Sequence, residues 1–128
     1  MLVRLAVAAA ALVVAFALYR LWKRPPRRLS GASLLELGVA GPAIVQFSTR
    51  SCAPCRTARP KLIEAAADAE VDYAQIELDD RPEVAGRFGI RSVPTIVVTG
   101  PGGTVRGVWT SLPTNGEITE AARRARPA

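Results

Sequence analysis

The sequence predicts an α/β domain with one central mixed sheet of about four strands flanked by helices, preceded by one N-terminal transmembrane helix. Three features of the chain lead to this prediction. They are a charge-free apolar stretch near the start, an alternation of strand and helix patterns over residues 43–88, and a glycine-rich turn at 100–103 between two later strand patterns. We therefore expect an anchor over residues 1–22, a basic linker with prolines over 23–31, and a domain over 32–128.

The helix expected over residues 2–22 is long and apolar enough to cross a membrane. Its central part, LAVAAAALVVAFALY, contains no charged residue. About 21 residues at a rise of 1.5 Å span roughly 30 Å of hydrocarbon. A cleaved signal peptide is the alternative, because Ala15-Phe16-Ala17 has the small residues of a cleavage site. The apolar run continues beyond that site to Trp22, which favours an anchor.

Positive charge is concentrated around this anchor. The chain has 17 basic and 11 acidic residues, but from Leu29 onward 11 basic residues meet 11 acidic ones. Because the domain itself is neutral, we expect no nucleic-acid partner. The linker arginines are expected to contact membrane lipid headgroups. The positive-inside rule predicts a single-pass cell-membrane protein with its domain on the cytoplasmic face; a domain outside the cell is the alternative.

The other elements are expected in the order strand, helix, strand, helix, strand, strand, helix. Short β-branched or alternating patterns predict strands over 43–48, 73–78, 95–99 and 104–109. Helical patterns cover 32–39, the cysteines to residue 69, 81–88 and 114–126. The turn at 100–103 indicates a hairpin with antiparallel strands.

The long central helix has two notable features. Pro60 lies inside it and is expected to kink it. Its buried face is expected to contain Leu62, Ile63, Ala66 and Ala69.

The two cysteines carry the predicted chemistry. Cys52-Ala53-Pro54-Cys55 lies where a loop after a strand meets a helix, so Cys52 is expected at the helix N-terminus. There the free backbone N–H groups stabilise a thiolate. Cys52 would attack a disulfide, and Cys55 would resolve the mixed disulfide. Three nearby arginines are expected to add positive charge: Arg50, Arg56 and Arg59.

Three other interpretations of the cysteine pair are less consistent with the sequence. A purely structural disulfide closing so short a loop would remove little chain entropy. A metal site would need two more ligands, and the chain has no third cysteine and no histidine, so we expect no metal and no cofactor. A redox-inert scaffold would more readily have lost one of the two cysteines.

The segments FSTRSCAPCRTARP and FGIRSVPTIVV resemble the thioredoxin superfamily. The resemblance runs from about residue 43 to the C-terminus, and with the anchor and basic linker the layout is similar to small membrane-anchored thioredoxin-family proteins of actinobacteria. It implies a thioredoxin-like fold in which Pro60 is the helix proline. It also implies that Pro94 is a cis-proline facing the disulfide, and that Val93 offers backbone groups to a substrate peptide.

The chain departs from the thioredoxin pattern at the positions that surround the cysteines. Gln46 and Gln75 stand where thioredoxins have a buried aspartate and its lysine partner, and they are either hydrogen-bonded to each other or neutral fillers. Ser51 and Ser48 replace aromatic residues. These changes weaken the proton relay and the apolar docking rim, which puts fast, general thioredoxin-type reduction in doubt.

Together these features predict a membrane-anchored thiol-disulfide oxidoreductase of the protein-disulfide reductase type. Its expected partners are protein disulfide substrates and a thiol/disulfide electron donor or acceptor. The alternatives are an extracytoplasmic thioredoxin-like protein for envelope disulfide metabolism and a non-catalytic interaction module with the same fold.

Overall fold

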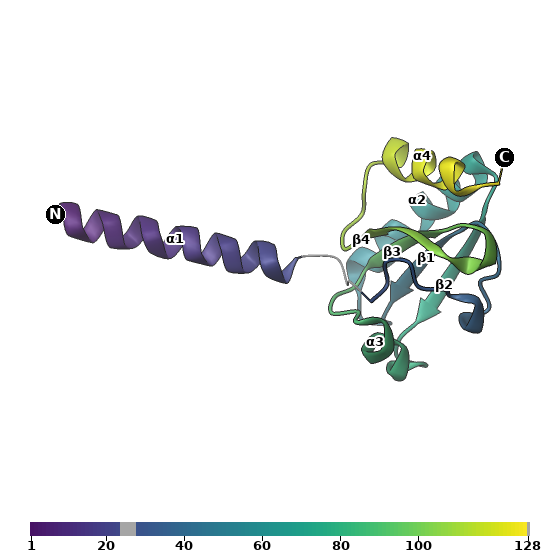
Figure 1. Ribbon diagram of the computed structural model, residues 1–128, viewed down its shortest axis with the longest axis horizontal. Coiled ribbons are helices and arrows are strands. Elements are labelled where there is room, and N and C mark those ends of the chain that lie inside the picture. The colour runs from purple at the N-terminus through teal and green to yellow at the C-terminus, as the bar shows by residue number, and fades with distance from the viewer. Residues whose placement is uncertain (24–27, 128) are drawn as a thin grey trace.

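The computed structural model describes residues 1–23 and 28–127, so residues 24–27 of the predicted basic linker lie outside the described residues. The first helix, α1 (Leu2–Trp22), stands apart from the folded domain (Figure 1), and none of its residues is buried. It is long and apolar enough to span a membrane. A signal sequence near the N-terminus would meet the same criteria.

The domain is built on a four-stranded mixed sheet in the order β2-β1-β3-β4. The strands are β1 (Ala43–Ser48), β2 (Asp72–Glu77), β3 (Thr95–Thr99) and β4 (Val105–Trp109). β1 pairs with β2 in parallel, whereas β1 with β3 and β3 with β4 are antiparallel pairs. Every residue of β1 and β3 is buried, because these central strands are covered on both faces. The predicted mixed sheet and hairpin are confirmed.

Helices cover both faces of this sheet (Figure 1). α2 (Ala53–Ala69) and α4 (Asn115–Ala125) pack on one face over a core that includes Ile44, Leu62 and Ile118. α3 (Pro82–Phe88) lies on the other, where Phe47, Phe88 and residues from the segment after the linker form a second core. The thioredoxin-like α/β prediction is therefore confirmed.

Two local predictions were wrong. Residues 32–39 do not form a regular helix but contain a 3-10 turn, η1 (Leu35–Leu37), which ends at Gly38 with φ 90°. The turn is short because Leu34 is buried and its N–H donates to the carbonyl of Gly103 instead of extending a helix. In α2, Ile63 is 43% exposed, and the buried face contains Ala58 and Ala65 in its place.

Candidate active site

The two cysteines form a disulfide at the start of α2. Cys52 is the N-cap of the helix, and its Sγ accepts a hydrogen bond of 3.2 Å from the N–H of Cys55. Ala53 and Pro54 form the exposed first turn between them. Cys52 is 8% exposed and Cys55 is 3% exposed, so Cys52 is the more accessible of the two residues.

This position suits a nucleophilic thiol. The first backbone N–H groups of a helix lack intrahelical partners and carry the positive end of the helix dipole. The hydrogen bond from Cys55 N–H already points at Sγ of Cys52, and it stabilises negative charge there when the disulfide is reduced. The site can therefore hold a reactive thiolate at Cys52 with its partner cysteine three residues away.

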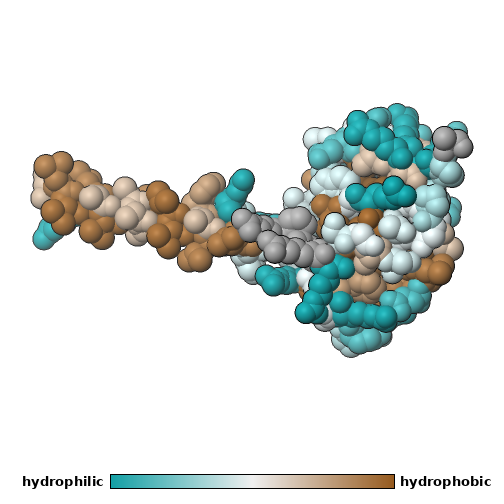
Figure 2. All heavy atoms as spheres, viewed as in Figure 1, coloured by the Kyte–Doolittle hydropathy of each residue, from teal (hydrophilic) through white to brown (hydrophobic). Residues whose placement is uncertain are grey.

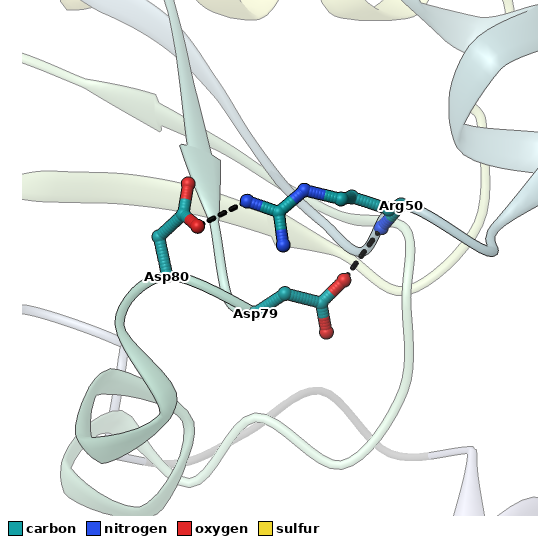
Figure 3. A network of polar contacts seen from close by, with 3 residues as sticks. All are labelled: Arg50, Asp79 and Asp80. Carbon is teal, nitrogen blue, oxygen red and sulfur yellow. Dashed lines mark hydrogen bonds and ion pairs between the residues drawn. The ribbon is translucent and has the colours of Figure 1, made fainter.

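The loop before Cys52 is fixed by two acidic residues that follow β2. The N–H of Arg50 donates to Asp79 Oδ2 at 2.8 Å, and the Arg50 guanidinium pairs with Asp80 (Figure 3). The hydrogen bond that the Arg50 guanidinium donates to Asp80 raises the pKa of Arg50. Because Asp80 compensates its charge, Arg50 adds less positive potential at Cys52 than the sequence suggested. The Arg56 guanidinium bridges the same loop by donating to the carbonyl of Arg50 at 3.0 Å.

A buried amide lies beneath Cys55. Gln46 is 1% exposed, and its Nε2 donates to the backbone carbonyl of Cys55 at 2.8 Å. Its Oε1 accepts from the hydroxyl of Tyr73 on β2 at 2.6 Å. Burial raises the pKa of Tyr73, against a smaller opposing effect of the positive charge of Arg59. A neutral chain of hydrogen bonds thus runs from Tyr73 through Gln46 to the backbone of Cys55.

Gln75 takes no part in that chain. It is level with Gln46 in the β1–β2 register, but its side chain is exposed and its Nε2 donates to Ser48 Oγ at 2.8 Å. Of the two alternatives for these glutamines, a hydrogen bond between them is not the one found, because each side chain bonds to other partners. Ser48 is itself buried, so Gln75 satisfies a polar group that the sheet has removed from water.

The loop before β3 lies at the same end of the sheet as the disulfide. The Val93–Pro94 peptide bond is cis, and Thr95 Oγ1 holds the loop by donating to the carbonyl of Ser92 at 2.7 Å. β3 is antiparallel to β1, so its first residues lie beside the end of β1 that leads to Cys52. Pro94 is buried and Val93 is partly exposed. Pro60 lies inside α2, where its ring is exposed.

Two features of the site were not identified from the sequence. Tyr73 was predicted only as a strand residue. A buried tyrosine hydroxyl usually has a hydrogen-bond partner, and this rule is the signal that identifies Tyr73 as part of a polar network. The acidic residues after β2 were assigned no role from the sequence, yet Asp79 and Asp80 fix the loop before Cys52. Among residues 1–23 and 28–127, no group of three His, Cys, Asp or Glu side chains is arranged to hold a metal ion.

Comparison with known proteins agrees with this geometry. A family model for thioredoxin matches residues 35–121. Thioredoxin 2 of Chlorobaculum tepidum is 36% identical over 75 residues, covering 57% of this chain and 69% of the relative. The chloroplastic M-type thioredoxin of Zea mays is 35% identical over 66 residues, covering 50% of this chain and 40% of the relative.

Solved structures show the same fold. A mutant thioredoxin from Halobacterium salinarum superposes with a TM-score of 0.63 at 19% identity, covering 77% of this chain and 89% of that one. The fold, the disulfide at the start of α2 and the match over most of the domain lead to one conclusion: the chain belongs to the thioredoxin family of disulfide oxidoreductases.

Proposed function

We propose that this protein is a membrane-anchored protein-disulfide reductase whose domain lies on the cytoplasmic face. The observation that carries the proposal is the position of Cys52. This residue caps α2, accepts a hydrogen bond from the N–H of Cys55, and lies at the same end of the sheet as the cis Val93–Pro94 bond. A substrate peptide would lie along Val93, whose backbone groups pair with it as an added strand.

The reaction begins with the reduced protein. The Cys52 thiolate attacks one sulfur of a substrate disulfide, forms a mixed disulfide and releases the other substrate sulfur as a thiolate, which takes a proton from water. The Cys55 thiolate then attacks Sγ of Cys52 and releases the second substrate thiol. Two electrons have moved to the substrate, and the new Cys52–Cys55 disulfide is reduced again by a dithiol donor.

Gln46 positions Cys55 in this cycle but does not exchange a proton with it. Its amide holds the Cys55 carbonyl, and Tyr73 fixes the orientation of the amide. Since neither side chain is a base near neutral pH, the proton of Cys55 leaves to water or to the departing substrate thiolate. We expect resolution of the mixed disulfide to be slower than in thioredoxins with a buried carboxylate.

Anchoring rests on α1 and the charges that follow it. Figure 2 shows the helix as an apolar column with hydrophilic side chains near each end. The basic residues after Trp22 outnumber those before the apolar run, which favours a cytoplasmic domain. Contact of these residues with lipid is part of the proposal.

The test combines topology with activity. Intact and permeabilised cells are labelled after mild reduction with a membrane-impermeant maleimide, and Cys52→Ser/Cys55→Ser serves as the unlabelled control. We expect labelling only after permeabilisation, and we expect the purified full chain in detergent to reduce insulin. Labelling in intact cells would instead support an envelope thioredoxin-like protein. Failure to reduce any disulfide with both thiols free would support a non-catalytic interaction module.

A further inference from the structure

The anchor and the redox pair lie near the same end of the sheet. β1 ends there, just before Cys52, and β3 begins there, because Phe47 pairs with Thr95. β4 ends there as well, since Trp109 pairs with Ile96 near the start of β3. The disulfide, the cis-proline loop and the first residues after β4 therefore lie at the same end of the sheet.

The segment that connects α1 to the domain enters the domain close to this end of the sheet. Leu29 is fully buried in the core that contains Phe88 and Ile90. Arg28 Nη1 lies 3.4 Å from the carbonyl of Gly86, and the Arg28 side chain packs beside Gly89. The segment that follows Gly89 leads directly to the cis-proline loop.

The end of α1 contacts the same loop region. Thr110 Oγ1, immediately after β4, donates to the carbonyl of Lys23 at 3.3 Å. A small cavity of about 70 Å³ lies at this junction and is lined by Trp22, Lys23, Arg91, Ser92, Val93 and Thr110. Val93, the residue proposed to pair with substrate, is thus next to the end of the membrane-spanning helix.

The tether, residues 23–28, is too short to let the domain move far from the bilayer. Only residues 23–28 separate Trp22, at the end of the span, from buried Leu29. Seven residue steps cover at most about 25 Å when fully extended. The exposed basic side chains of Lys23, Arg28 and Arg91 at the junction add attraction to anionic headgroups.

From this arrangement we infer that the substrate is a disulfide in the juxtamembrane segment of an integral membrane protein. The inference rests on the proposed function and names its substrate class. Chemistry at the sulfur atoms is unchanged: two electrons pass from the Cys52–Cys55 dithiol to the substrate disulfide, which becomes two thiols. The short tether selects substrates by distance, because two groups confined to the same narrow layer meet at a high effective concentration.

The test uses the pre-reduced full chain in vesicles of phosphatidylethanolamine and phosphatidylglycerol, under single-turnover conditions. Two membrane-spanning peptides carry the same disulfide-bonded cysteine pair. In the near peptide the pair follows the span directly, and in the far peptide a 20-residue proline-rich spacer holds it roughly 60 Å away. We expect reduction of the near peptide to be at least about tenfold faster.

A variant with the same spacer inserted after Lys23 is the matched comparison, and it should lose this preference. Both proteins should reduce glutathione disulfide at equal rates, which reports the proposed activity alone. Equal rates on the near and far peptides, with glutathione disulfide still reduced, would overturn the inference and leave the proposed function intact. Reduction of none of the three disulfides would contradict the proposed function, and the inference with it.

Discussion

Replacing Tyr73 by phenylalanine removes one hydroxyl group from the layer beneath the redox pair and leaves the ring in place. The hydroxyl donates to Gln46 Oε1 at 2.6 Å, and Gln46 is 1% exposed, so water cannot replace the lost donor. A buried acceptor left without a partner costs about 1–3 kcal/mol of unfolding free energy. We therefore expect Tyr73→Phe to destabilise the domain by about 2 kcal/mol.

The measurement is urea unfolding of the full chain in detergent micelles, monitored by the fluorescence of Trp109 in a Trp22→Phe background. Tyr19→Phe is the matched control, because it removes the hydroxyl of an exposed tyrosine on α1 and should change the unfolding free energy by less than about 0.5 kcal/mol. In the double variant Gln46→Met/Tyr73→Phe the two losses should be less than additive. A Tyr73→Phe protein within about 0.5 kcal/mol of the parent would refute the proposed hydrogen-bond chain.

Three further predictions follow from the described residues. Burial raises the pKa of Tyr73 above its ordinary 10.0. Since the unfolded tyrosine ionises first, stability should fall as the pH rises from 10 through the raised pKa, and urea titrations should show a shallower fall for Tyr73→Phe. Gly103→Ala places a methyl group against a backbone carbonyl at φ 70°, whereas Gly102→Ala, at φ 74°, meets nothing closer than 3.9 Å. Gly103→Ala should cost at least about 2 kcal/mol more in urea unfolding, and equal losses would contradict this packing. Asp79→Ala frees the Arg50 N–H, so amide exchange there should accelerate by about tenfold, and unchanged exchange would count against the fixed loop.

Local sequence patterns predicted most of the fold because the elements are short and bounded by turn residues. The strand over residues 43–48 and the hairpin turn at 100–103 were predicted from β-branched runs and glycines, which act within a few residues. The cysteine pair was placed at a helix start by the same kind of local pattern. Most predictions that rested on a local pattern alone were therefore confirmed, and the helix over residues 32–39 is the exception.

The errors concern residues whose environment depends on distant parts of the chain. The segment over 32–39 has a helical composition, but Leu34 pairs with Gly103, which lies far along the sequence. Ile63 is apolar yet exposed, because the buried face of α2 is set by how the sheet and α4 contact it. The partners of Gln46 follow from the β1–β2 register and from the position of Cys55, which composition does not encode.

The order of attack by the two cysteines tests the account most directly. The Cys55→Ser and Cys52→Ser variants of the full chain are each incubated with a peptide disulfide, and the adducts are identified by mass spectrometry. The account predicts that Cys55→Ser accumulates a mixed disulfide through Cys52. Cys52→Ser should form almost none, because its remaining cysteine, Cys55, is only 3% exposed in the parent. Equal or faster adduct formation at Cys55 would contradict the assignment of Cys52 as the attacking thiol.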